Sequence, residues 1–199
     1  MFYRIIALCF FVWSQFLFAQ KIIVVRHGEA LQNVLNVINS DIEKSKQYSL
    51  TKTGRNQIRE TGLTLRKLGF ADEEVCKIFV SPLHRTKQTA GLLAETMELS
   101  LNKITTDFDI REIEAGNHEG LTVKKAEALN KLGVPYHGET NIDVEKRLAE
   151  FIKRLEHLPQ EKTVFVVTHG LPAQLLIQML KSEKLVQMPE KGSFTIVER

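Results

Sequence analysis

Four side chains in this sequence are of types that bind or attack a phosphoryl group. They are Arg26, His27, Arg85 and His169. Each stands at or shortly after the end of an apolar, largely β-branched run. Such runs are typical of buried strands. Because the carboxyl ends of parallel strands meet at one edge of a sheet, where α/β proteins bind ligands, we expect these side chains to share a pocket.

Paired arginines indicate an anionic ligand, because guanidinium groups donate two parallel hydrogen bonds to phosphate oxygens. A neutral histidine in such a pocket can attack phosphorus, and a second histidine can stabilise the charge that develops in the transition state. The sequence contains no GxxxxGK[ST] segment, so ATP use is not indicated.

Strands and helices alternate along the predicted fold. We expect strands near residues 22–25, 77–80, 104–106, 163–168 and 194–197, the last at a sheet edge. Helices are expected over about 31–37, from the Thr51–Gly54 segment to about 68, and over 85–99, 123–132, 141–158 and 172–180, with Asn141 as a cap. This order predicts an α/β three-layer sandwich, a mainly parallel sheet with helices on both faces.

The N-terminus is predicted to be a signal peptide. One basic residue, Arg4, precedes a nearly continuous apolar stretch from Ile5 to Phe18, and cleavage is expected after Ala19. Residues 1–19 would then be removed, and 20–199 would form one domain that is exported, periplasmic or secreted, without stable membrane association. The alternatives are an uncleaved anchor and a buried first helix.

Charge and cysteine content restrict the partners. The 199 residues include 27 basic and 24 acidic side chains, a balance that does not favour nucleic acid. Beyond the leader the single cysteine, Cys76, excludes an intramolecular disulfide and is expected to be a small buried apolar residue. We predict no metal site and no cofactor.

Six segments, in this order, resemble branch 1 of the histidine phosphatase superfamily, also called phosphoglycerate mutase-like. They match RHGExxxN, LTxxG, SPxxRxxxTA, REIxxGxxEG, GESxxDVxxR and VTHG. The segments are Arg26–Asn33, Leu50–Gly54, Ser81–Ala90, Arg111–Gly120, Gly138–Arg147 and Val166–Gly170. The resemblance covers nearly the whole chain after the leader and implies the phosphoglycerate mutase-like fold.

The resemblance also implies roles for particular residues. His27 would be the nucleophile that becomes phosphohistidine, and Glu112 the general acid and base, with a pKa raised toward the working pH. The phosphoryl group would be bound by Arg26, Arg85, His169 and Asn33. Three other carboxylates are expected to cap loops or face solvent: Glu29, Glu114 and Glu119.

Two features depart from the family pattern. His118 stands where GxWEG has an aromatic residue, and the segment between Glu112 and His169 is short beside the mutases. The sequence thus favours a metal-independent phosphomonoester hydrolase acting on a small phosphorylated substrate. The alternatives are a phosphoglycerate mutase-type phosphotransferase, a phosphoprotein phosphatase and a non-catalytic anion-binding protein. The sequence specifies neither the substrate nor the oligomeric state.

Overall fold

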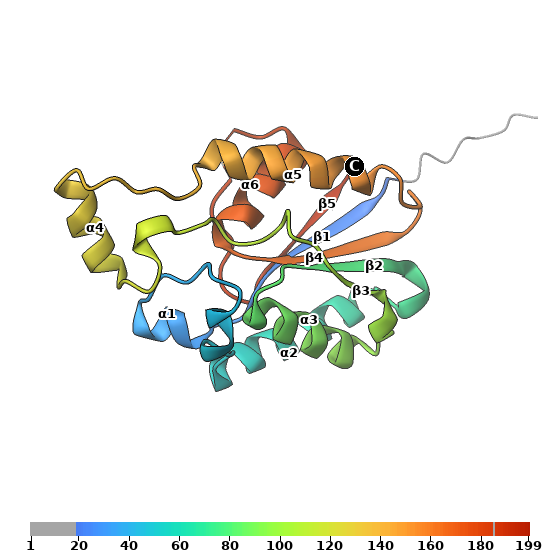
Figure 1. The fold of residues 1–199 in the computed structure, drawn as a ribbon. Coiled ribbons are helices and arrows are strands. Elements are labelled where there is room, and N and C mark those ends of the chain that lie inside the picture. Colours follow the sequence, from blue (N-terminus) through green and yellow to red (C-terminus); the bar gives the residue numbers. More distant parts are fainter. Residues whose placement is uncertain (1–18, 185) are drawn as a thin grey trace, which may run out of the picture.

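A computed structural model describes residues 19–184 and 186–199 (Figure 1). Apart from Ala19, the predicted leader lies outside these residues. No helix in the described part of the chain is long and apolar enough to cross a membrane.

The centre of the fold is a five-stranded sheet in the order β3-β2-β4-β1-β5. The strands are β1 (Lys21–Arg26), β2 (Val75–Val80), β3 (Ile104–Thr106), β4 (Thr163–Thr168) and β5 (Phe194–Glu198). The first four run parallel to one another, and β5 pairs antiparallel with β1 at the edge. The expected strands and the mainly parallel sheet are confirmed.

Helices cover both faces of this sheet, as the amphipathic spacing predicts. They are α1 (Leu31–Leu35), α2 (Lys52–Lys67), α3 (His84–Met97), α4 (Val123–Lys131), α5 (Asn141–Leu155) and α6 (Gly170–Lys181). Figure 1 shows α2 and α3 on one face and α5 and α6 on the other, with α4 standing away from the sheet. Two apolar cores result, one on each face, because alternate residues of β1 and β4 point to opposite sides.

Four local expectations need correction. Thr140, not Asn141, caps α5: its hydroxyl accepts from the Asp143 backbone N–H, and the Asp143 carboxylate returns a bond to the Thr140 N–H. Helix α5 ends at Leu155, and α6 already begins at Gly170. Cys76, on β2, is only half-buried.

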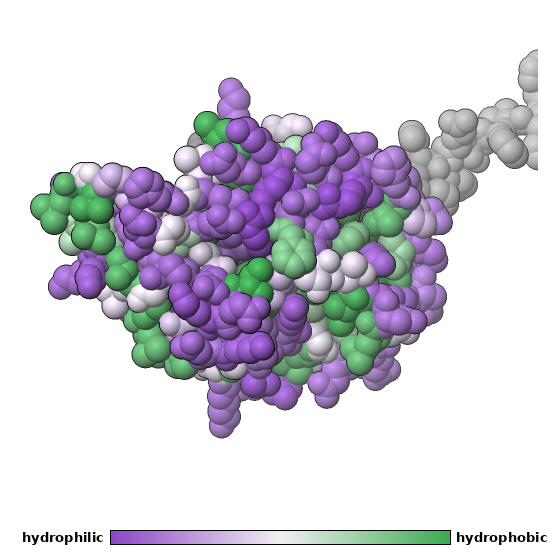
Figure 2. All heavy atoms as spheres, viewed as in Figure 1, coloured by the Kyte–Doolittle hydropathy of each residue, from purple (hydrophilic) through white to green (hydrophobic). Residues whose placement is uncertain are grey.

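The face of the molecule that Figure 2 shows is mostly hydrophilic, with apolar side chains gathered on the projecting end that carries α4. Leu132 and Val134, just after α4, are among the exposed large apolar residues. The loops between this projection and the sheet edge bring the segments around Asn39, Glu112 and His118 toward the ends of β1, β2 and β4.

Candidate active site

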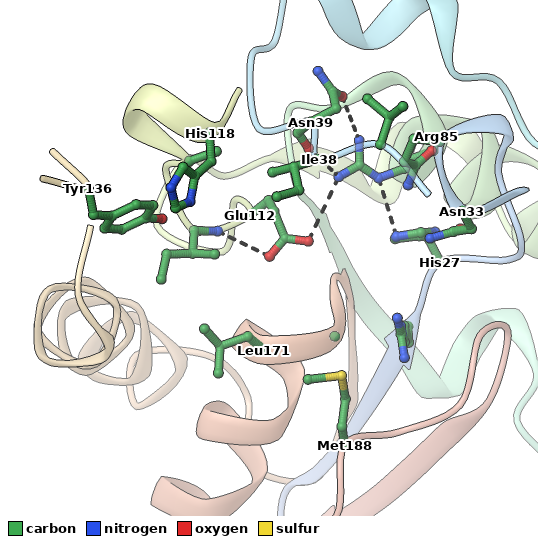
Figure 3. A pocket seen from close by; sticks show the side chains of 16 residues that line it. His27, Asn33, Ile38, Asn39, Arg85, Glu112, His118, Tyr136, Leu171 and Met188 are labelled. Atoms are coloured by element: carbon green, nitrogen blue, oxygen red, sulfur yellow. Dashed lines mark hydrogen bonds and ion pairs between the residues drawn. The ribbon is translucent and has the colours of Figure 1, made fainter. Parts of the chain in front are cut away.

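His27 lies directly after β1 and is 2% exposed. Its Nδ1 is 2.7 Å from the carbonyl oxygen of Gly28, and Nε of Arg85 donates to its Nε2 across 3.2 Å (Figure 3). A proton on Nδ1 satisfies the first contact and leaves the lone pair on Nε2. The ring is therefore oriented with its nucleophilic nitrogen toward the arginine that enters the pocket.

His27 is held in the neutral form. Burial lowers its pKa well below the ordinary value, and the positive charges of Arg85 and Arg26 lower it further, partly opposed by the bond to Gly28. A neutral imidazole is the nucleophilic state, so the environment prepares this residue for attack on an electrophile.

The guanidinium of Arg85 is fixed by the loop that follows α1. This side chain is 1% exposed, and burial lowers its pKa to about 10, which leaves it charged at neutral pH. Its Nη1 donates to Oδ1 of Asn39 and its Nη2 to the Asn39 carbonyl, both at 3.0 Å. Asn39 is in turn held by a hydrogen bond of 2.9 Å to the Glu119 carboxylate.

His169, at the end of β4, packs edge-on to His27 with 5.2 Å between ring centroids. Its Nε2 is 2.7 Å from Oγ of Ser81. A serine hydroxyl that donates to Nε2 leaves the ring proton on Nδ1, which is buried and lies 3.6 Å from Oε2 of Glu112. Burial lowers the pKa of His169 well below its ordinary value, so this ring too is neutral.

Arg26 and Asn33 both line the same pocket. Nη1 of Arg26 donates to the carbonyl of Pro189 at 2.7 Å, and its buried Nε has no hydrogen-bond partner among the described residues. Asn33 uses its side-chain oxygen to accept from the backbone N–H of Ala30 at the start of α1. Its amide group therefore has a structural role in addition to any contact with a ligand.

Glu112 reaches the pocket from the loop after β3. Its Oε1 accepts from the Ile113 N–H at 3.1 Å, and Oε2 lies 3.8 Å from Nη2 of Arg85. Burial raises the pKa of this carboxyl, although the charge of Arg85 opposes the shift. A carboxyl with a raised pKa beside a nucleophile is suited to give and take a proton near neutral pH.

The loop that carries Glu112 is anchored by an ion pair between Arg147 on α5 and Glu139, which lies just before that helix. Arg147 donates to the carbonyls of Asp109 and Glu112 at 2.6 and 3.2 Å, and to both carboxylate oxygens of Glu139 at 3.0 Å each. Arg111 contacts the same Glu139 carboxylate at 2.7 Å. We call Arg147 and Glu139 the loop anchor.

The pocket has a volume of about 340 Å³ and extends beyond Glu112 to His118 and Tyr136. Figure 3 shows those two rings on the side of Glu112 away from His27. Among the described residues, no group of three or more histidine, cysteine, aspartate or glutamate side chains is arranged to hold a metal ion.

The structure brings together every residue singled out from the motifs: Arg26, His27, Asn33, Arg85, Glu112 and His169. The expectation for Glu119 also fits, since it caps a loop by accepting from Ser40 and Asn39. Sequence reasoning missed Asn39, Tyr136 and Met188 as pocket residues. Of the other pocket residues, the sequence analysis named only His118, because it departs from the family pattern.

Comparisons with known proteins identify the family and the fold. The family model described as the histidine phosphatase superfamily, branch 1, matches residues 22–198. The chain is similar to phosphoglycerate mutase-like protein 4 of Arabidopsis thaliana, at 25% identity over 75% of this chain and 66% of that one. It is similar to 2-carboxy-D-arabinitol-1-phosphatase of Triticum aestivum, at 29% identity over 80% of this chain and 32% of that one. It thus spans less than two thirds of the length of both relatives. The solved structure of Bacillus stearothermophilus YhfR superposes with a TM-score of 0.75, at 24% identity over 89% of this chain and 90% of that one.

Proposed function

Because this chain belongs to branch 1 of the histidine phosphatase superfamily, we propose that it hydrolyses small phosphomonoesters through a phosphohistidine formed on His27. Its relatives include both a phosphatase and a mutase-like protein. The choice between hydrolysis and transfer therefore depends on the chemistry of this site.

The observation that carries the proposal is the set of nitrogen donors around a neutral His27. Arg85 Nε reaches its Nε2, while Arg26 Nε and His169 Nδ1 are buried without a partner in the described chain. Buried donors without partners are unfavourable, and the oxygens of a phosphoryl group would supply the missing acceptors. Two of these donors are charged, which suits a dianionic ligand.

In the first step, the lone pair on Nε2 of His27 attacks phosphorus, and the bond from phosphorus to the leaving oxygen breaks. The electron pair of that bond goes to the leaving oxygen, which takes the proton of the Glu112 carboxyl. The arginines and His169 stabilise the charge on the equatorial oxygens during transfer. The products are phosphohistidine, an alcohol and a Glu112 carboxylate.

In the second step, the Glu112 carboxylate takes a proton from water as the water oxygen bonds to phosphorus. The phosphorus–nitrogen bond breaks, and its electron pair returns to Nε2 of His27. Inorganic phosphate leaves, and both residues regain their starting protonation states. A mutase would instead return the phosphoryl group to a bound hydroxyl.

The test is turnover of para-nitrophenyl phosphate by the chain with and without its nucleophile. His27→Ala is expected to abolish both turnover and the acid-labile phosphorylation of the protein by this substrate. His157→Ala, which replaces an exposed histidine, is expected to retain both. EDTA is expected to leave the rate unchanged, because the arginines balance the phosphoryl charge. Full activity of His27→Ala would refute the proposal, and isomer formation from a phosphoglycerate without free phosphate would identify a mutase.

A further inference from the structure

The far end of the pocket differs in chemistry from the end that holds His27. Apart from its hydrogen-bonding groups it is formed by five side chains that come from four separate segments, which we call the apolar wall. They are Val37, Ile38, Ile113, Tyr136 and Leu171. Such a wall favours a leaving group with an apolar body.

Two buried polar side chains that line the pocket each have an atom without a hydrogen-bond partner in the described chain. His118 is 4% exposed, and no described residue hydrogen-bonds its Nε2. Gln32 is 5% exposed, and its Oε1 likewise has no partner in the described chain. Buried polar atoms in proteins are nearly always hydrogen-bonded, so these two atoms point to groups supplied by a bound molecule.

The ring of His118 is held in place by its neighbour. Tyr136 packs against it with 5.0 Å between centroids and a tilt of 49°. The hydroxyl of Tyr136 donates to the carbonyl of Glu114 at 2.6 Å, so its own hydrogen bond is satisfied. The imidazole is therefore the polar group at this end of the pocket that remains available to a ligand.

Charge at this end disfavours a second anion on the substrate. Among the described residues that line the pocket, the only lysine or arginine side chains are Arg26 and Arg85, both committed to the phosphoryl group. Burial, followed by the charges of the Glu139, Glu112 and Glu114 carboxylates, raises the pKa of Tyr136, which indicates an acidic surrounding. Two nearby arginines, Arg147 on α5 and Arg111 in the loop that carries Glu112, are already paired with the Glu139 carboxylate.

We propose that the preferred substrate is the phosphomonoester of an uncharged alcohol with an apolar body and a hydroxyl group that hydrogen-bonds to His118. This inference rests on the proposed function and adds the leaving-group class. A hydroxyl both donates and accepts, so it can pair with the imidazole nitrogen whether that nitrogen carries a proton or not. A carboxylate would be buried beside lining residues that include no lysine or arginine other than Arg26 and Arg85.

Three substrates of equal reacting geometry test this inference: benzyl phosphate, 4-(hydroxymethyl)benzyl phosphate and 4-carboxybenzyl phosphate. The methylene next to the phosphate keeps the chemistry of the leaving oxygen similar in all three. For the unmodified chain we expect kcat/KM about fivefold higher for the hydroxymethyl compound than for benzyl phosphate, as one added hydrogen bond provides. We expect the carboxyl compound to be at least about tenfold poorer than benzyl phosphate, because burying an unpaired charge is unfavourable.

The role of His118 is tested by the same ratio in two variants. In His118→Phe the ratio of hydroxymethyl to unsubstituted substrate is expected to fall to about one, whereas His157→Phe, the same change at an exposed site, should keep the original ratio. A preference of the unmodified chain for the carboxyl compound, or an unchanged ratio in folded His118→Phe, would overturn the inference. If these ratios fail while His27-dependent turnover of para-nitrophenyl phosphate persists, the proposed function stands and only the leaving-group class is wrong.

Discussion

Replacing Arg147 with methionine tests whether the loop anchor positions the acid. The change keeps an unbranched apolar stem but removes the guanidinium and its four hydrogen bonds, two to backbone carbonyls and two to the Glu139 carboxylate. The Arg147 and Glu139 side chains are 8% and 11% exposed, so their pair is largely shielded from water. The substitution therefore removes a largely buried ion pair, not one at the surface.

The expected loss of stability follows from that burial. Removing one partner of a buried ion pair costs about 3–5 kcal/mol, whereas exposed pairs contribute about 0–1 kcal/mol. Glu139 keeps Arg111 as a partner at 2.7 Å, which places Arg147→Met at the lower end, about 3 kcal/mol. A domain with roughly 5–15 kcal/mol of stability remains folded after this loss.

The assay has two readouts, urea denaturation and kcat for benzyl phosphate. We expect kcat to fall about tenfold or more, because Glu112 loses the bond from Arg147 to its carbonyl and a misplacement near 1 Å is costly. The matched control is Lys153→Met on the same helix, whose pair with Glu150 is 65% and 60% exposed, and it should change stability by less than about 1 kcal/mol. Equal effects of the two variants on stability, or an unchanged kcat in Arg147→Met, would refute the positioning role.

Two further predictions concern protons. Glu112→Gln should lower kcat/KM for benzyl phosphate by about 10²–10⁴ but much less for para-nitrophenyl phosphate, whose leaving group needs no proton. In the unmodified chain kcat/KM for benzyl phosphate should fall as pH rises through the raised pKa of Glu112, and an unchanged pH profile in the variant would exclude it as the acid. The lowered pKa of His27 means that the unfolded chain binds an extra proton below about pH 6.5, so stability is present above that pH and is lost as pH falls. Urea titrations should show the slope with pH below 6.5 reduced by about 1.4 kcal/mol per pH unit in His27→Phe, and equal slopes would contradict a buried neutral ring.

The sequence could predict the sheet and the phosphoryl end of the pocket because both depend on local patterns. Apolar runs that end in Arg-His or Thr-His identify strands and their carboxyl ends, and a parallel sheet brings those ends together. The cap of α5 shows the limit of such patterns. Thr140 and Asn141 are both good capping residues, and only the backbone geometry decides between them.

Several other residues of the pocket could not be predicted individually because they meet only through tertiary packing. Asn39 lies in a polar connection without periodicity, yet it fixes Arg85 from 46 positions away. Tyr136 and Met188 come from loops whose composition resembles that of ordinary surface segments. His118 was visible only as a departure, and its missing hydrogen bond becomes apparent only in the folded chain.

Two carboxylates outside the reacting centre divide the positioning of this site between them. Glu119 holds Asn39, which fixes the guanidinium beside the nucleophile, and Glu139 holds Arg147, which fixes the loop of Glu112. Ser40 connects these two sets of contacts, because its hydroxyl donates to the Glu119 carboxylate and accepts from the backbone N–H of Ala115 in the loop that carries Glu112. The loops that lack secondary structure are thus fixed by charge-assisted hydrogen bonds. His27 and His169 are positioned by the ends of β1 and β4, whereas Arg85 and Glu112 depend on these loops as well, so a change in either loop is expected to affect both phosphoryl binding and proton transfer in the proposed reaction.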